Sequence, residues 1–102
     1  MIRHIVLIRF RADVSDRAIA AIFAELAALR GVIPGFRHLV AGKSESPEEI
    51  ERGYMHGFVA DFDDWEALKR YADDERHKAA GAKLVANAVG GIDGILVFDL
   101  AC

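Results

Sequence analysis

The sequence predicts an α+β domain in which a four-stranded antiparallel sheet carries helices on one face. Three observations support this prediction. Apolar residues alternate with a period of two near both ends of the chain, at residues 2–10 and 95–100. Two longer stretches, at about residues 16–29 and 63–89, repeat apolar residues at helical spacing instead. The chain of 102 residues is 53% hydrophobic, which suits one domain with a packed core.

The first half of the chain reads as strand, helix, strand. Residues 2–10 alternate as a strand, and Ser15 is suited to cap the helix that follows. Gly31 and Pro34 end that helix. Residues 36–43, "FRHLVAGK", are the second predicted strand, and a polar connection separates them from the second half of the chain.

The second half repeats the order. Residues 54–62 predict a third strand, and Asp63 with Glu66 three residues later resembles a capping box that opens a helix. More helical sequence follows at about 75–89, and "GGIDG" leads into a last strand, "ILVFDL". The order β-α-β-β-α-β is the ferredoxin-like, split βαβ arrangement, which we expect to occupy residues 1–102 as one domain.

The first and last strands carry apolar residues on both faces. Ile5 and Leu7 oppose Val6 and Ile8, and the last strand shows the same pattern. Helices cover only one face, so a monomer would expose an apolar sheet surface of a size that usually marks an interface. We therefore expect a homodimer through the helix-free sheet face, closing a dimeric α/β barrel.

Composition excludes several classes of partner. The 13 basic and 16 acidic residues give a net charge of −3 and are spread along the chain, which argues against a nucleic-acid or anionic-membrane surface. No apolar run is long enough to span a membrane. Cys102 is the only cysteine, so neither a disulfide framework nor a zinc-thiolate cluster is expected. These features predict a cytoplasmic protein with no membrane partner.

Residues 71–81, "YADDERHKAAG", raise a question of geometry. Residues six apart on one continuous helix, such as Tyr71 and His77, point about 120° away from each other. Two successive Asp are unfavourable at a helix C-terminus, whereas Asp74 is a favourable N-cap. We therefore predict that one helix ends near Ala72 or Asp73 and another begins after Asp74, with His77 as its third residue. The break lets Tyr71 and His77 converge, and the helix N-terminus favours a neutral imidazole.

Three more ionisable residues lie on strand faces that, if the helices cover them, point into the space between sheet and helices. Period two places His4, His56 and Asp99 on the same faces as the core residues of their strands. An unpaired buried polar group costs about 1–3 kcal/mol, so we expect these groups to meet one another or a ligand. Taken singly, each histidine also fits a hydrogen-bonded core or sheet-edge residue, and Tyr71 fits a packing residue. The joint pattern is what indicates a cavity.

Other kinds of site receive less support. Three histidines are able to bind a metal, but they lack the i, i+4 spacing of zincins and a nearby Glu, so we predict no metal. The "GGIDG" stretch precedes a strand and opens no helix, which makes it a turn and not a phosphate cradle. Cys102 lies at a chain end and is poorly placed for catalysis. His38 has no assigned role.

Five features together resemble the stress-responsive dimeric α+β barrel (Dabb) domain family over nearly the whole chain. They are "HIVLIRF", "IPGF", "GYMHGFVADF", the Tyr71-to-His77 spacing and "ILVFDL". The best understood member is a plant polyketide cyclase that performs an aldol condensation without a cofactor. The resemblance implies that His77 is a general base, that Tyr71 donates to a carbonyl or enolate oxygen, and that Asp99 orients the imidazole. It also implies that His4 and His56 position a small-molecule substrate, and that no cofactor is needed.

The resemblance implies a pocket wall as well, with two departures from the cyclase. The expected wall residues are Val6, Ile8, Ile22, Leu26, Phe58, Ile95 and Val97. Leu26 stands where the cyclase carries an aromatic residue, and Ala79, Ala80 and Gly81 replace bulkier residues after His77. The substrate of the cyclase therefore does not carry over to this chain.

Three hypotheses for function follow. The first is a cofactor-free cyclase, lyase or isomerase acting on a small carbonyl or polyketide-like compound. The second is a non-catalytic, stress-associated or small-ligand-binding dimer, in which the polar interior is only a satisfied network. The third is a cofactor-free monooxygenase of the same superfamily, with Trp65 lining the site; taken alone, Trp65 fits a packing residue better.

Overall fold

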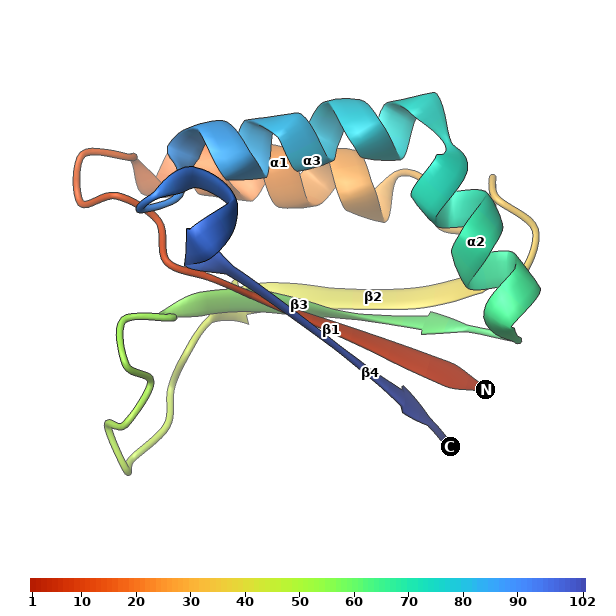
Figure 1. The fold of residues 1–102 in the computed structure, drawn as a ribbon, viewed down its shortest axis with the longest axis horizontal. Coiled ribbons are helices and arrows are strands. Elements are labelled where there is room, and N and C mark those ends of the chain that lie inside the picture. Colours follow the sequence, from red (N-terminus) through yellow and green to blue (C-terminus); the bar gives the residue numbers. More distant parts are fainter.

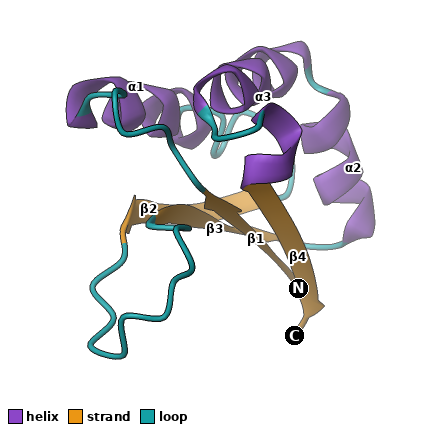
Figure 2. Ribbon diagram, turned by 60° about the vertical axis from the view of Figure 1, so that its left-hand side comes forward, coloured by secondary structure: helices purple, strands orange, loops and turns teal.

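The computed structural model describes residues 1–102 as a four-stranded antiparallel sheet with helices on one face (Figure 1). The elements are β1 (Ile2–Ile8), α1 (Asp16–Ala27), β2 (Phe36–Lys43), β3 (His56–Phe62), α2 (Trp65–Asp73), α3 (Glu75–Asn87), the 3-10 turn η1 (Gly91–Gly94) and β4 (Ile95–Ala101). The strand order is β2-β3-β1-β4. Helices α1 and α3 lie side by side above the sheet, and α2 stands beside one end of it (Figures 1 and 2). The predicted α+β, ferredoxin-like fold is confirmed.

Element ends differ from the prediction where backbone hydrogen bonds leave the sheet. Strand β1 stops at Ile8 because the next residue, Arg9, pairs with the turn after α3. The Arg9 N–H donates to the Gly94 carbonyl at 2.8 Å, and the Val89 N–H donates to the Arg9 carbonyl at 2.7 Å. Strand β3 begins at His56, two residues later than predicted, and α3 ends at Asn87. Each difference is confined to an element terminus.

The N-cap of α2 is one residue later than the capping-box pattern predicted. The Asp64 carboxylate accepts the Ala67 N–H at 2.9 Å, which is the bond of an N-cap. Asp63 is still tied to the sheet, because its N–H donates to the Gly35 carbonyl at 2.9 Å. Its carboxylate pairs with the Arg37 guanidinium through two contacts of 2.7 Å. The prediction that Asp63 caps this helix was therefore wrong.

The core fills the space between the helices and the sheet. The register of β1 and β3 sets Ile2 opposite Phe62 and Val6 opposite Phe58, so that side chains of both strands point to the same layer. Leu26 of α1 meets them and is fully buried. The core is completed by further buried residues from all three α-helices and from β2, among them Ile19, Ile22, Phe23, Phe36, Leu39, Tyr71 and Leu84.

The other face of the sheet is apolar and open. Val40 is 72% exposed and Phe98 is 59% exposed, and both point away from the helices. Leu7, Leu96 and Leu100 extend the same surface. The connection at residues 44–55 projects beyond this face (Figures 1 and 2). No helix of the protein has the length and apolar character needed to cross a membrane.

Candidate functional site

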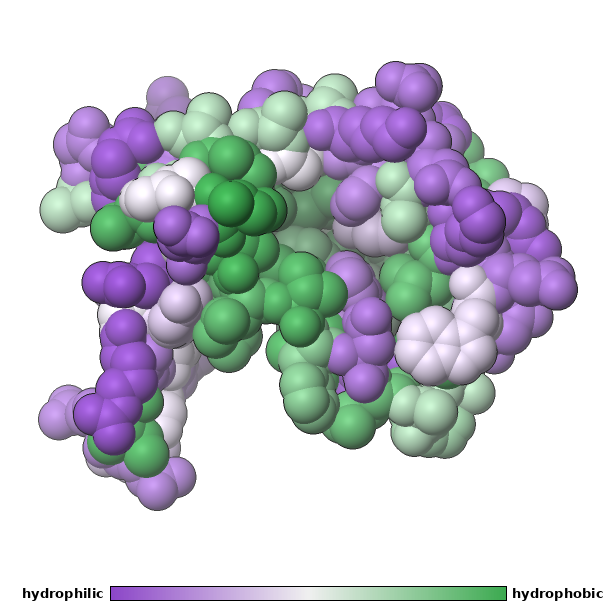
Figure 3. Space-filling model, viewed as in Figure 1, coloured by the Kyte–Doolittle hydropathy of each residue, from purple (hydrophilic) through white to green (hydrophobic).

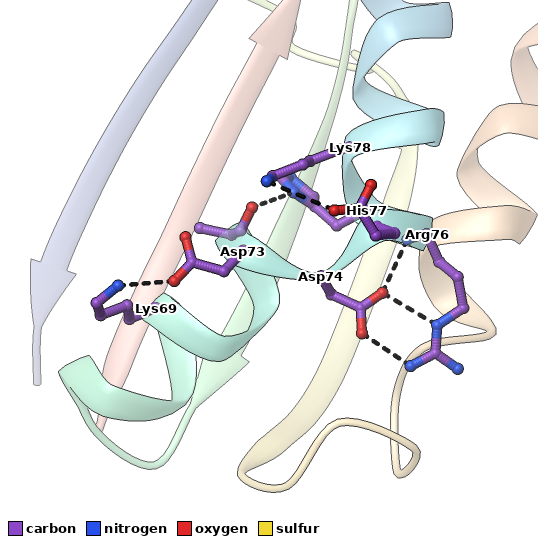
Figure 4. Close-up of polar contacts among 8 residues, drawn as sticks. Lys69, Asp73, Asp74, Arg76, His77 and Lys78 are labelled. Atoms are coloured by element: carbon purple, nitrogen blue, oxygen red, sulfur yellow. Dashed lines mark hydrogen bonds and ion pairs between the residues drawn. The ribbon is translucent and has the colours of Figure 1, made fainter.

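The site begins at the break between α2 and α3. Helix α2 ends at Asp73 and α3 begins at Glu75, and the residue between them, Asp74, has extended backbone angles of φ −70° and ψ 132°. Its carboxylate accepts the Arg76 N–H at 2.9 Å and pairs with the Arg76 guanidinium at 3.0 and 2.8 Å (Figure 4). These hydrogen bonds hold the pKa of Asp74 at about 2, so the cap is charged at neutral pH. The predicted break, with His77 as the third residue of α3, is confirmed.

The break brings Tyr71 and His77 together. Their ring centroids lie 4.2 Å apart, with 45° between the ring planes. The His77 Nδ1 lies 3.2 Å from the Ala72 carbonyl oxygen, which only accepts (Figure 4). Nδ1 is therefore the protonated nitrogen, and Nε2 keeps its lone pair. Burial lowers the pKa of His77 from its ordinary value of 6.5, although the bond to Ala72 acts in the opposite direction. The ring is neutral at pH 7 and able to accept a proton.

Tyr71 supplies a hydrogen-bond donor with no partner of its own. The residue is 1% exposed, and its ring packs against those of Phe36 and Phe62 at centroid distances of 5.1 and 5.0 Å. The hydroxyl is buried and makes no hydrogen bond. Burial also raises the pKa of Tyr71, so the proton stays on the oxygen. A buried polar group without a partner is rare, and its presence calls for an explanation such as a catalytic role or an ordered water.

His4 is held by Asp99 from the neighbouring strand. The register sets the two residues directly opposite each other on β1 and β4, and His4 Nδ1 lies 2.5 Å from the Asp99 carboxylate. The His4 ring is 5.9 Å from the Tyr71 ring. The predicted orientation of the basic imidazole by Asp99 is not what the structure shows, since Asp99 holds His4 and the Ala72 carbonyl holds His77. Asp99 pairs with His4 because of the register between β1 and β4, and the alternation of apolar residues in the sequence does not reveal that register.

A pocket joins these three side chains. A cavity of about 260 Å³ lies under α2 and α3, beside β1 and β4, and has His4, Tyr71 and His77 in its wall. The rest of its wall is apolar and includes Val6, Phe58, Leu68, Leu84, Ile95 and Val97. Figure 3 shows the molecule hollowed between the helices and the sheet on this side. Four predicted wall residues therefore line it: Val6, Phe58, Ile95 and Val97.

Other predicted site residues lie elsewhere. Ile8 and Leu26 are fully buried and Ile22 is nearly so, and all three belong to the packed core, away from the pocket wall. Trp65 is 56% exposed and does not line the pocket, in contrast to the expectation attached to a monooxygenase. The positions of Ile22, Leu26 and Trp65 depend on how closely their helices pack against the sheet, and the period of apolar residues does not specify that distance.

His56 shares the covered face with His4 but not the pocket. It stands opposite Ile8 in the register, whereas His4 stands opposite Ala60, four residues further along β3. At about 3.3 Å per residue this separates the two histidines by roughly 13 Å. The His56 ring packs against Phe10 at 5.4 Å. It lines a different groove of about 530 Å³ between α1 and β2.

Some pocket residues escaped the sequence reasoning. Leu84 and Val85 line the pocket at positions seven and eight after His77, next to Gly81, which the resemblance had already singled out as a small residue. That spacing is one face of a helix, so it would have indicated them once the helix start was known. The Ala72 carbonyl, which fixes the His77 tautomer, has no sequence signal. No group of three or more His, Cys, Asp or Glu side chains is arranged to hold a metal ion.

Comparison with known proteins gives the family context. Residues 2–102 match the model of the Dabb family, described as the Stress responsive A/B Barrel Domain. The stress-response A/B barrel domain-containing protein HS1 of Arabidopsis thaliana is 28% identical over 98 residues, covering 96% of this chain and 86% of that protein.

Solved structures share the fold over almost the whole chain. A dimeric ferredoxin-like protein of unknown function from Jannaschia sp. CCS1 has a TM-score of 0.93 and 33% identity, covering 99% of this chain and 98% of that one. A hydroxynitrile lyase from Passiflora edulis has a TM-score of 0.82 at 19% identity, covering 97% of this chain and 90% of the lyase. At that identity the likeness to the lyase concerns the fold alone.

Proposed function

Since the chain belongs to the stress-responsive A/B barrel (Dabb) domain family, we propose that it is a cofactor-free acid/base enzyme of the cyclase, lyase or isomerase type. Its substrate is a small carbonyl or polyketide-like compound. One observation carries the proposal: Tyr71, whose hydroxyl is buried without a hydrogen-bond partner, and His77, whose ring is neutral, line one pocket with their ring centroids 4.2 Å apart. Proton abstraction next to a carbonyl needs a base and a donor placed in this way.

The chemical step uses only these two side chains. His77 Nε2 removes a proton from the carbon next to the substrate carbonyl. The electron pair of the broken C–H bond forms the C=C bond of an enolate, and the carbonyl π electrons move to oxygen. The Tyr71 hydroxyl donates a hydrogen bond to that oxygen, where the negative charge develops. In a cyclase the enolate carbon then attacks a second carbonyl carbon of the same molecule, the π electrons of that carbonyl move to its oxygen, and protonated His77 gives its proton to this oxygen. In an isomerase His77 returns the proton to a different carbon.

His4 and Asp99 serve as a positioning pair beside this step. Because Nδ1 of His4 is engaged by the Asp99 carboxylate, Nε2 is the nitrogen left for a substrate hydroxyl. The pair comes from two adjacent strands, with side-chain exposures of 12% for His4 and 28% for Asp99. A ring held by a carboxylate keeps one orientation, which suits the binding of a second oxygen of the substrate.

Hydrogen–deuterium exchange of a simple ketone tests the proposal. In D2O the protein should accelerate loss of the α-proton NMR signals of 4-phenylbutan-2-one. His77→Gln and Tyr71→Phe should each lower the acceleration tenfold or more, because general acid/base groups contribute about 10²–10⁴ in rate. His38→Gln is the matched control, since His38 is exposed on β2 outside the pocket. Exchange no faster than in buffer, or equal in the His77 and His38 variants, would refute the proposal.

A non-catalytic role in ligand binding is the second candidate. It is favoured by the fact that both His4 and His77 already have hydrogen-bond partners within the protein, as a purely structural network would. In that case the ketone should shift the ring-proton signals of both histidines without any exchange above the buffer rate. The two outcomes separate binding from catalysis in the same sample.

We also propose that two copies associate through the helix-free sheet face. The exposed apolar side chains of β1, β2 and β4 support this assembly, and the Jannaschia relative is described as dimeric. Face-to-face packing of two sheets would bury residues such as Phe98 and Val40 that are costly to leave in water. A cytoplasmic location remains a prediction from the single terminal cysteine and the absence of an apolar run in the sequence.

A further inference from the structure

Gly81 has no structural reason to be glycine. It lies in the interior of α3, where glycine is among the least favourable residues, and its φ angle is not positive. A Cβ atom added at this position would meet nothing within 4 Å. Gly35 is the opposite case, because there φ is +87° and a Cβ would lie 2.5 Å from the Ala67 Cβ. The space left by Gly81 is therefore not required by the fold.

The open space beside Gly81 belongs to the pocket. Gly81 lines it together with His77, one turn before, and Val85, one turn after. The rise of 1.5 Å per residue makes the line from His77 to Val85 about 12 Å long. Gly81 stands at the middle of that line. The polar groups of the pocket gather at the His77 end, and its other end, near Val85, Ile92 and Ile95, is apolar.

We propose that Gly81 determines the length of the substrate. Its missing side chain leaves the middle of the pocket open, so that a compound whose carbonyl lies between His77 and Tyr71 extends an apolar chain or ring past Gly81 toward Val85. This inference rests on the proposed function and narrows its substrate class to elongated carbonyl compounds with one polar end and one apolar end. A branched side chain at residue 81 fills the passage and restricts the pocket to short compounds.

Two ketones with the same carbonyl end provide the test. Butan-2-one and 4-phenylbutan-2-one differ only by the terminal phenyl group, and their dissociation constants are measured from the ring-proton NMR shifts of His4 and His77. The wild-type protein should bind the phenyl compound at least tenfold more tightly. In Gly81→Leu the phenyl compound should bind more weakly, so that the two dissociation constants become about equal. Gly81→Ala should reduce the difference between them only in part. Ala82→Leu, at the adjacent exposed position of α3, should keep the wild-type ratio.

The outcomes separate this inference from the proposed function. A wild-type ratio retained in Gly81→Leu would overturn the role of Gly81, while ketone exchange that depends on His77 would leave the proposed function standing. If neither ketone shifts the ring-proton signals of His4 or His77 in the wild-type protein, both the role of Gly81 and the proposed function are overturned. Because Gly81→Ala adds a better helix former in open space, it should also raise the melting temperature, which verifies that substitution at this position leaves the fold intact.

Discussion

Tyr71→Phe should stabilise the protein while it lowers the ketone exchange that we propose. The substitution deletes a buried hydroxyl that has no hydrogen-bond partner and keeps the ring that packs against Phe36 and Phe62. Leaving such a group unpaired costs about 1–3 kcal/mol. We take the lower end of this range as a conservative value. The expected gain is about 1 kcal/mol in the free energy of unfolding.

Thermal unfolding at a fixed protein concentration measures this gain. For a domain of about 100 residues, 1 kcal/mol corresponds to a rise of about 4–8 °C in melting temperature. The concentration must be held constant because dimer formation would itself shift the transition. Tyr54→Phe is the matched control. The Tyr54 ring lies under the Arg9 guanidinium at 5.6 Å and outside the pocket, so no rise is expected there.

Two results would contradict this reasoning. A loss of about 1 kcal/mol or more in Tyr71→Phe would mean that the hydroxyl makes a hydrogen bond in the folded protein, because removing a satisfied group costs this much. A gain in stability together with unchanged ketone exchange would show that the spare donor of Tyr71 has no part in the chemistry. Only a gain in stability combined with a loss of exchange supports both halves of the argument.

Three other predictions concern titration, the core and the assembly. Because burial lowers the pKa of His77 below 6.5, the unfolded state binds more protons, and the free energy of unfolding should fall as pH drops through 6.5. Urea unfolding between about pH 7 and 5 should show a smaller decline in His77→Gln, and an equal decline would refute this origin. Leu26→Ala should destabilise by about 2–5 kcal/mol, because Leu26 is 0% exposed, and should leave the ketone-induced shifts at His4 unchanged. If Leu26→Ala alters the ketone-induced shifts at His4, Leu26 is part of the pocket wall after all. Phe98→Glu should convert a dimer to a monomer in analytical ultracentrifugation, whereas Ala82→Glu on the exposed helix surface should not; a dimer that survives Phe98→Glu would exclude the sheet face.

Local chemistry explains which parts of the site were predictable. The break between α2 and α3 depends on residues within one short stretch, where the capping ability of Asp74 and the spacing of Tyr71 and His77 are visible in the sequence. The cap of α2 is a local feature too, but Asp63 and Asp64 are chemically identical neighbours. The hydrogen bond from the Asp63 N–H to the Gly35 carbonyl keeps Asp63 out of the helix, so Asp64 is the N-cap.

Features that depend on position along the strands were not predictable. Period two assigned His4 and His56 to the correct face, yet the distance between them follows from the register of β1 and β3. The pairing of Asp99 with His4 likewise follows from the register of β1 and β4. Ile22 and Leu26 were expected at the pocket because they lie on the buried face of α1, but α1 packs beside α3 and over β2, so its buried face enters the core.

The place of β4 in the sheet affects how the site opens. The strand lies at an edge and is hydrogen-bonded only to β1, yet it contributes Asp99 to the positioning pair and Ile95 and Val97 to the pocket wall. Local detachment of an edge strand requires less free energy than global unfolding. Hydrogen exchange should therefore report faster opening for the β4 amides than for those of β3, which lies inside the sheet. A partner subunit seated on the sheet would slow that opening, so the exchange rate of the β4 amides would depend on protein concentration.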